Sequence, residues 1–303
     1  MAWSETTRPA SETDSLAFDK PLLVGGGLAH ISSSIEWRTT GSFSSGSNGV
    51  DAAFPTTNMI DDFQHKFSRP SSSAVTWYII GQFASNVTFN FCAILGHNFG
   101  TIGGLTVSLQ IADDNAFTTN LVTLRQESPG TSNKRLIWPY LSKDAPTGGL
   151  SRNYAAQYWR IKIDGTSGQP RVGEIILGLQ RQLNQRPNEP YDPTQTVSQV
   201  DYFDPGSGVV TQYSRYRGRR KLDAEITTIN ATEDAVVNGW YSSCNQGTRP
   251  FLWIENPTTN PKNAPYLILN DPGLFRPYGN GPSLRTWSLT AVEQGTSFVL
   301  TET

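Results

Sequence analysis

The sequence is short of the residue types on which most enzymes and metal proteins depend. Its 303 residues include only two cysteines, Cys92 and Cys244, and three histidines, His30, His65 and His97. The cysteines have no metal-ligand spacing and form no disulfide framework, so we expect two buried thiols. No nucleophile or zinc motif accompanies the histidines. We therefore predict a protein that is not an enzyme and has no cofactor.

Charge and long apolar runs are also scarce. Charged residues make up 17% of the chain and the formal net charge is −2, so no strong overall field attracts nucleic acid or an anionic membrane. No apolar run approaches the ~20 residues that a membrane helix needs, and the first residues lack the apolar stretch of a signal peptide. We expect a soluble protein without membrane insertion, for which nucleic acid is not the expected partner.

What the chain has instead is typical of short strands joined by turns. Glycine (27) and proline (19) are abundant, and several short segments have the composition of strands, three of which (87–95, 105–111 and 159–163) alternate along the chain with a period of two. These segments are residues 75–80, 87–95, 105–111, 159–163 and 174–179. Within 87–95, the odd-numbered residues from Val87 to Leu95 are expected to share one face. Strands of this kind indicate a sandwich of antiparallel sheets.

The order of these signals divides the chain into four parts. In order they are an extended N-terminal arm (residues 1–20), a β-sandwich (21–182), a Pro-rich linker (183–198) and a smaller β-rich α+β domain (199–303). A length of 303 residues agrees with two domains. Because the linker contains three prolines, we expect it to be semi-rigid.

One segment of the last part has a helical period. Residues 232–245 place Val236 and Trp240 on one face. Asn230 or Thr232 can cap the N-terminus, because a side-chain oxygen there accepts a backbone N–H of the first turn. The predicted fold class is therefore mainly β, a sandwich followed by an α+β domain with one main helix.

Six motifs occur in a fixed order in the first half. They are Asn58–Asp62, Thr76–Ile80, Ile94–Asn98, Val107–Asp113, Ala156–Ile163 and Gly173–Gly178. An Asp-containing loop before a Trp-x-Ile strand, and the later Tyr-Trp-Arg-Ile strand, resemble those of the galactose-binding-like (discoidin-like) superfamily. The resemblance implies a jelly-roll sandwich.

The second half carries two further motifs, Gly218-Arg-Arg-Lys-Leu222 and Pro250-Phe-Leu-Trp253. With the order of the two domains, they resemble bacteriophage tail and baseplate proteins. The resemblance implies a virion structural protein of the tail tip, baseplate or neck, assembled in the host bacterial cytoplasm. Its partners would be copies of itself in a ring and other virion proteins. The alternative function is that of a carbohydrate-binding module that attaches to host-surface glycans.

Two pairs of residues are candidate ligands, each with a plainer interpretation beside it. Asp61 and Asp62 could hold a structural Ca²⁺, which prefers carboxylate oxygens and which galactose-binding-like domains often hold near this loop. They could equally form a surface turn with two solvated carboxylates. His97 and Asn98, at a strand end, could hydrogen-bond a sugar or could satisfy backbone groups of a loop.

A cationic run precedes the strand that begins near residue 222. Arg215, Arg217, Arg219, Arg220 and Lys221 are interleaved with tyrosine in residues 213–221. Such a run could contact nucleic-acid phosphates. Because it leads directly into a strand, and because arginine is enriched at protein interfaces, we favour a contact between subunits.

Overall fold

The computed structural model describes most of the chain as three antiparallel sheets and one main helix. The described residues are 6–7, 21–24, 32–39, 49–74, 76–129, 135–139, 141, 152–165, 168–183, 186–188, 191–192, 196–203, 211–228, 230–257, 261–270 and 285–294. Apart from Thr6 and Thr7, the arm expected over residues 1–20 lies outside them. The mainly β fold class with one main helix, expected from the sequence, is confirmed.

The first two sheets form a sandwich. The first sheet contains, in order, β3 (Ser32–Thr39), β4 (Thr76–Phe89), β9 (Arg152–Asp164), β6 (Thr106–Ala112) and β7 (Val122–Glu127), and β1 (Thr6–Thr7) also pairs with β9. The second contains β10 (Glu174–Gly178), β5 (Phe91–Leu95) and β8 (Arg135–Trp138). Two short helices, η2 (Thr56–Met59) and α1 (Phe99–Ile102), lie in the connections. A large apolar core that includes Trp77, Trp138 and Trp159 fills the space between these sheets.

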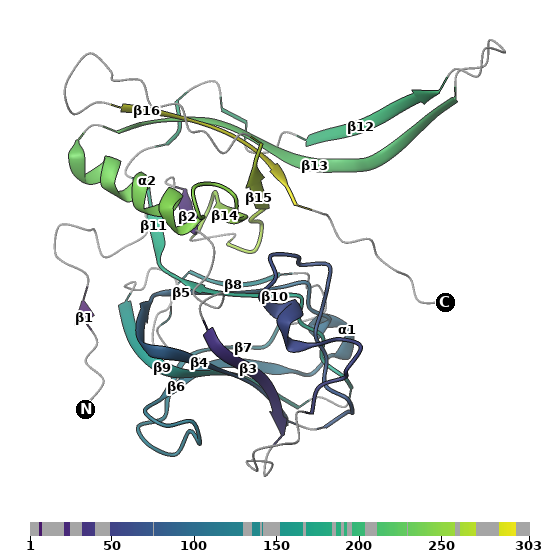
Figure 1. Ribbon diagram of the computed structural model, residues 1–303, viewed down its shortest axis with the longest axis vertical. Helices are drawn as coiled ribbons and strands as arrows, with labels where there is room; N and C mark the ends of the chain where they lie inside the picture. The colour runs from purple at the N-terminus through teal and green to yellow at the C-terminus, as the bar shows by residue number, and fades with distance from the viewer. Residues whose placement is uncertain are drawn as a thin grey trace.

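The third sheet covers the other face of the second. Its order is β11 (Gln180–Gln182), β2 (Leu22–Val24), β14 (Phe251–Ile254), β15 (Tyr266–Leu269), β16 (Arg285–Glu293), β13 (Thr211–Thr228) and β12 (Thr196–Phe203). The three sheets stack as layers with β10, β5 and β8 in the middle (Figure 1). We call the apolar layer between the second and third sheets the seam. Its members are Val24, Phe91, Ala93, Leu95, Ile137, Ile176, Leu252, Ile254, Ala264 and Tyr266.

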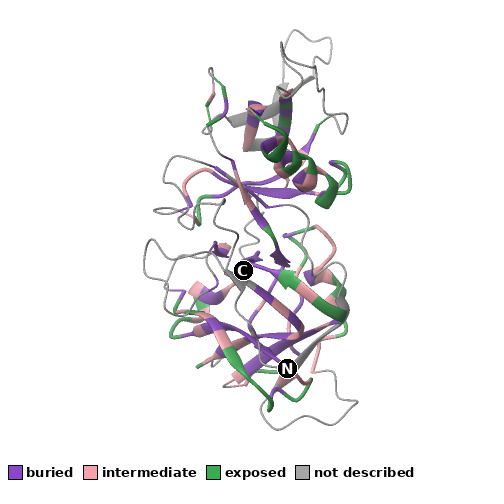
Figure 2. Cartoon of the chain, turned by 90° about the vertical axis from the view of Figure 1, so that its left-hand side faces the viewer, coloured by how far each residue is buried: buried purple, intermediate pink, exposed green. Residues whose placement is uncertain are grey.

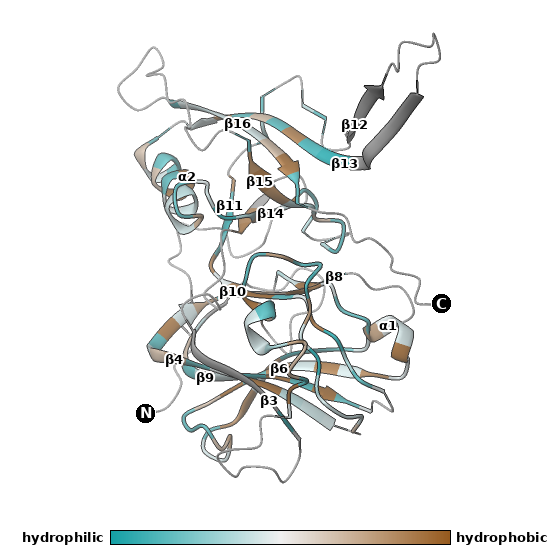
Figure 3. Cartoon of the chain, turned by 45° about the vertical axis from the view of Figure 1, so that its right-hand side comes forward, coloured by the Kyte–Doolittle hydropathy of each residue, from teal (hydrophilic) through white to brown (hydrophobic). Residues whose placement is uncertain are grey.

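Strand β5 shows why the middle layer differs from an ordinary sandwich strand. All five of its residues are buried, because Cys92 and Ile94 face the sandwich core while Phe91 and Leu95 face the seam. Hydrophobic residues also dominate β8 and β10 (Figure 3), and Figure 2 shows buried residues along the strands in the interior of the molecule. A strand buried on both faces reads as a continuous apolar run.

The single face expected for the odd residues of 87–95 is therefore wrong. Phe89 belongs to the sandwich core but Phe91 belongs to the seam, because the chain leaves the first sheet and enters the second at Asn90. The Asn90 side chain is buried and accepts the backbone N–H of Gln180 at 2.8 Å. The backbone N–H of Asn90 donates to the carbonyl of Gly178 at 3.0 Å. These bonds satisfy backbone groups that both strand breaks would otherwise leave buried and unpaired.

Helix α2 (Ala231–Ser243) covers the outer side of the third sheet. Asn230 is its N-cap, as expected, and accepts a backbone N–H of the first turn at 2.9 Å. Trp240 is buried as expected, together with Val237 and Cys244, whereas Val236 is only half-buried. Both cysteines are free and buried, as expected. Among the described residues, no helix is long and apolar enough to span a membrane.

Described residues of the proline-rich segment bond to the third sheet. Asn188 donates its backbone N–H to the carbonyl of Glu225 at 2.7 Å, and β12 already begins at Thr196. At the other end, β2 belongs to the third sheet through its pairing with β14, although residue 21 was expected to open the sandwich. The predicted domain boundaries remain a prediction, but the chain passes from sheet to sheet at other points.

Tyr191 fixes this segment to the third sheet. Its phenol oxygen bonds Glu255 and accepts the indole N–H of Trp253 at 2.9 Å. Burial, followed by the Glu255 carboxylate, raises the pKa of Tyr191. We expect Tyr191→Phe to lower the free energy of unfolding by about 1 kcal/mol, because the half-buried Glu255 carboxylate loses one of its two hydrogen-bond donors. Urea denaturation of the variant beside the wild type measures this, and equal midpoints would show that the contact contributes nothing.

Candidate functional site

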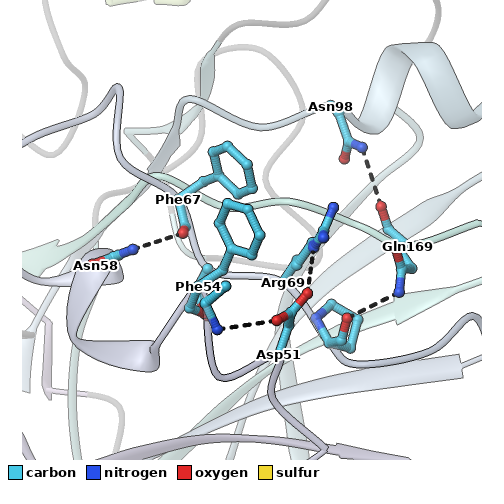
Figure 4. A network of polar contacts seen from close by, with 10 residues as sticks. Asp51, Phe54, Asn58, Phe67, Arg69, Asn98 and Gln169 are labelled. Atoms are coloured by element: carbon cyan, nitrogen blue, oxygen red, sulfur yellow. Dashed lines mark hydrogen bonds and ion pairs between the residues drawn. The ribbon is translucent and has the colours of Figure 1, made fainter. Parts of the chain in front are cut away.

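The candidate sugar ligands His97 and Asn98 lie where β5 ends, and both are used inside the fold. The Asn98 amide donates to the carbonyl of Gln169 at 3.1 Å and accepts the backbone N–H of Arg171 at 2.7 Å. Figure 4 shows Asn98 directed at Gln169, whose own amide reaches the carbonyl of Pro70. Asn98 therefore joins the loop after β5 to the loop before β10, which is the plainer of its two interpretations.

His97 is buried, with 6% of its surface exposed. Its ring stacks on Phe99 with 4.3 Å between centroids, and Nδ1 accepts the Phe99 backbone N–H at 3.3 Å. Burial, with a smaller contribution from the charge of Lys262, lowers the pKa of His97 to about 3. The imidazole is therefore neutral at physiological pH and enclosed, which does not suit direct hydrogen bonding to a solvent-borne sugar.

A stack of flat side chains lies in the same group of loops. The rings of Phe54 and Phe67 stack with 4.6 Å between centroids. The Arg69 guanidinium lies 4.2 Å from the Phe54 centroid, and that of Arg171 lies 4.9 Å from the Phe67 centroid. Asp51 accepts from Arg69 at 2.9 Å (Figure 4). Backbone and side-chain bonds to this carboxylate lower the pKa of Asp51. The stack orders residues 51–70, a segment with little regular secondary structure.

The two candidate calcium ligands have different partners. Asp61 accepts the backbone N–H of Phe63 and pairs with Lys66, both at 3.0 Å. Asp62 has a positive φ of 69°; its backbone N–H donates to Glu174 at 3.1 Å, and its carboxylate lies 3.9 Å from Arg249. The described residues contain no group of three or more His, Cys, Asp or Glu suited to a metal ion. The geometry favours the turn, although calcium binding remains an untested expectation.

We accordingly expect chelation to leave the thermal stability unchanged. Ca²⁺ needs six to eight oxygen ligands, and the Asp61 carboxylate already accepts hydrogen bonds from the Phe63 backbone N–H and from Lys66. Melting curves in EDTA and in millimolar Ca²⁺ should have midpoints that agree within about 1 °C, since a ligand that does not bind the native state cannot shift the transition. A higher midpoint in Ca²⁺ that is lost in Asp62→Asn would show that an ion binds there.

The cationic run lies on β13, the longest strand, with 18 residues. Residues 221–228 of β13 pair with β16, whereas residues 211–220 pair with β12. We call β12 together with residues 211–220 the ribbon. It extends away from the rest of the third sheet (Figure 1). In the described part of the chain, no strand pairs with the outer edge of either ribbon strand.

The five predicted contact residues separate into two groups along this strand. At the base, Arg220 donates to the carbonyl of Asn263 at 3.1 Å, and Lys221 pairs with Asp223 at 2.5 Å. Arg219 is half-buried there. Arg215 and Arg217 lie further out on the ribbon, and their side chains are outside the described residues. Arg220 therefore anchors the base of the ribbon to the loop at Asn263, and the outer cations are the candidates for contact with another molecule.

No protein-family model and no curated protein matches the chain. About half of the chain is similar to solved carbohydrate-binding modules. A chitosan-binding module of a chitosanase/glucanase from Paenibacillus sp. IK-5 is 13% identical, with a TM-score of 0.37, over 50% of this chain and 98% of the module. The CBM32 module of AlyQ, solved with 4,5-unsaturated mannuronic acid, is 17% identical with a TM-score of 0.33, over 48% and 94%. A Ruminococcus gnavus GH29 fucosidase matches over 22% of its own length, at 14% identity and a TM-score of 0.30.

Sequence reasoning missed the polar contacts that fasten the third sheet to the sandwich. Arg135 pairs with Glu293 at 2.6 Å, in a place where the glutamate side chain is only 5% exposed. Lys262 pairs with Glu127. Tyr266 is buried, and its pKa is raised by burial and then by the nearby carboxylates of Glu174 and Asp62. These partners lie far apart in sequence, so no local motif identifies them.

Proposed function

We propose that the protein is a structural subunit of a tailed bacteriophage particle and that the ribbon is its main contact with neighbouring subunits. The observation that carries the proposal is the ribbon itself, a pair of strands that leaves the body of the third sheet with both outer edges unpaired among the described strands. The similarity to tail and baseplate proteins in residues 218–222 and 250–253 supports the phage setting.

The energetics of a ribbon favour a partner. An isolated two-stranded hairpin is at best marginally stable in water, because it has no apolar face to bury. Unpaired edges also present rows of N–H and C=O groups that template pairing with another chain. A neighbouring subunit that pairs with the ribbon would supply the missing stabilisation.

The distribution of charge favours a second copy of this chain as the neighbour. Residues 215–221 contain five basic residues and no acidic one, which leaves 19 basic against 26 acidic residues elsewhere, a formal charge of −7. A basic ribbon on an otherwise acidic protein favours contacts between the ribbon of one copy and the remaining surface of another. Such contacts are head-to-tail, and head-to-tail contacts give a ring when the rotation between successive copies closes the assembly. A ring of copies is therefore the expected form.

Sedimentation velocity on the intact chain tests the proposal. We expect an oligomer whose dissociation is promoted by salt, because exposed charges are screened within ~8 Å at physiological ionic strength. A monomer at every protein and salt concentration would contradict assembly through copies of this chain. A ring-shaped particle in electron micrographs would support both the partner and the geometry.

The alternative is a carbohydrate-binding module for host-surface attachment. Several of the similar structures are carbohydrate-binding modules by name, but their low similarity gives no weight to a shared ligand. The two candidate sugar residues at the end of β5 are engaged within the fold. A glycan array probed with the intact chain separates the alternatives, since binding by a monomeric protein would favour attachment over assembly.

A further inference from the structure

The outer face of the first sheet, on the side away from the sandwich core, holds an arginine in an unusual setting. Arg160 of β9 is 7% exposed. Its guanidinium lies between two aromatic rings, 4.6 Å from the centroid of Tyr78 and 4.5 Å from that of Phe117. Its Nε donates to Gln110 at 2.7 Å, and Gln110 donates in turn to Thr123 at 2.9 Å. The guanidinium plane is therefore fixed in position from three directions.

This buried cation has no acidic partner among the described residues. Burial lowers the pKa of Arg160, and no carboxylate acts against that effect. Its only hydrogen bond uses Nε, so four of the five N–H donors remain. Neither terminal nitrogen is among the enclosed polar atoms without a partner, so neither is fully enclosed and a ligand at this face can reach both. Because the two rings and the rest of this face leave Arg160 only 7% exposed, the hydration of its guanidinium is restricted, and a carboxylate that paired with it would offset the cost of the partly desolvated charge.

The second ring is held over Arg160 by a strained but well-braced loop. Phe117 has a φ of 58°, which is rare for an aromatic residue. Asp114 accepts the backbone N–H groups of Thr118 and Thr119 at 2.9 and 3.2 Å. Hydrogen bonds from Thr118 contribute most to holding the pKa of Asp114 near 2, so this brace persists across the physiological range. Strain that the surroundings maintain is characteristic of ligand-binding positions.

Groups suited to a polar ring lie beside the free donors. Tyr158, two residues before Arg160 on the same face of β9, is half-buried and packs on the same aromatic cluster. Gln82 is its cross-strand partner on β4. Arg38, opposite Tyr78 on β3, donates to the carbonyl of Asn115 at 3.4 Å and adds positive charge at this face.

We propose that this face binds the carboxylate of an acidic saccharide, with the terminal nitrogens of Arg160 as the bidentate donors. Planar guanidinium and planar carboxylate match in a fork-to-fork pair. The phenol ring of Tyr158 offers an apolar surface with a polar tip for the sugar ring, a combination that favours a sugar acid over an acidic peptide. The site is independent of the proposed ribbon contact, and it gives the carbohydrate-binding alternative a position that the loop at Asn98 does not.

Titration of the intact chain with glucuronate and galacturonate, followed by tryptophan fluorescence and calorimetry, tests the site. Glucose, galactose and acetate are the matched probes. We expect the sugar acids to bind at least about ten-fold more tightly than the neutral sugars and acetate, because only they supply both the charge-assisted pair and the ring. Arg160→Lys keeps the charge but loses the fork, and should weaken sugar-acid binding about ten-fold.

Two further variants keep the test decisive. Tyr158→Ala should weaken the binding of the sugar acids and leave the binding of acetate unchanged. This test remains informative even where Arg160 variants fail to fold. Lys66→Gln removes an exposed cation elsewhere in the sandwich and should have no effect. Equal binding of glucose and glucuronate, equal binding of acetate and glucuronate, a preference for an acidic peptide, or no binding by the wild type would each overturn the proposal. None of these results bears on sedimentation, so failure here is distinct from failure of the assembly role.

Discussion

Shortening the ribbon at its base should convert the protein from an oligomer into a folded monomer. The change replaces residues 198–218 with an Asn-Gly turn between Val197 and Arg219, which pair in the native register. Asn-Gly suits the type I′ turn that joins two antiparallel strands. In the described part of the chain, the deleted strand segments pair with each other and with no other strand of the third sheet, so circular dichroism and the melting midpoint should change little. Light scattering after size exclusion measures the loss of assembly, which we expect to be about a hundred-fold or more in affinity if the ribbon is the central contact.

A charge reversal on the ribbon separates the effect of its backbone from that of its cations. Arg217→Glu changes the net charge by two, and Lys66→Glu makes the same change at a lysine whose side chain is 49% exposed on the sandwich. Only the first should weaken assembly and flatten its salt dependence, because interface charges act through complementary potentials. Equal effects of the two variants would mean that overall charge governs association. Normal assembly of the shortened chain would exclude the ribbon as the contact.

The elements that could be read from the sequence are those in which local pattern and tertiary environment agree. Period-two alternation located β6 and the end of β9, since both strands bury one face against the sandwich core. The cap at Asn230 marked the start of the helix, because its side-chain oxygen bonds a backbone N–H within the first turn. Features of this kind depend on neighbours in sequence, and they were predictable for that reason.

The parts that could not be predicted depend on partners far along the chain. Phe91 and Cys92 are adjacent and equally buried, yet they contact different cores, and an alternating pattern cannot show that a second layer covers the polar-looking face. Arg160 was visible in the sequence only as a member of the Ala156–Ile163 motif, and no motif related it to Phe117. Their contact requires the loop after β6 to fold back over β9, an arrangement that no spacing in the sequence reports.

A second large effect is expected from a single methyl group in the sandwich. Gly81 of β4 lies opposite Trp159 of β9 in the native register. A Cβ on Gly81 would lie 2.0 Å from Cζ2 and 2.1 Å from Cε2 of the Trp159 indole. The ring is fully buried and packs among Phe83 and other core residues, so it has no space into which to move. We expect Gly81→Ala to lower the free energy of unfolding by about 3 kcal/mol, at the upper end of overpacking costs.

Gly178 on β10 provides the matched control. It is buried in the same half of the molecule, but a Cβ there would have no heavy atom within 4 Å. Gly178→Ala should therefore change the stability by less than about 1 kcal/mol, and a small gain is expected because alanine restricts the unfolded chain. Urea denaturation of the two variants beside the wild type compares them. If both alanine variants lose the same stability, the loss of glycine itself is responsible. If only Gly81→Ala is destabilised, the cause is the indole of Trp159, which occupies the space beside Gly81. The aromatic packing between β4 and β9 then specifies the sandwich.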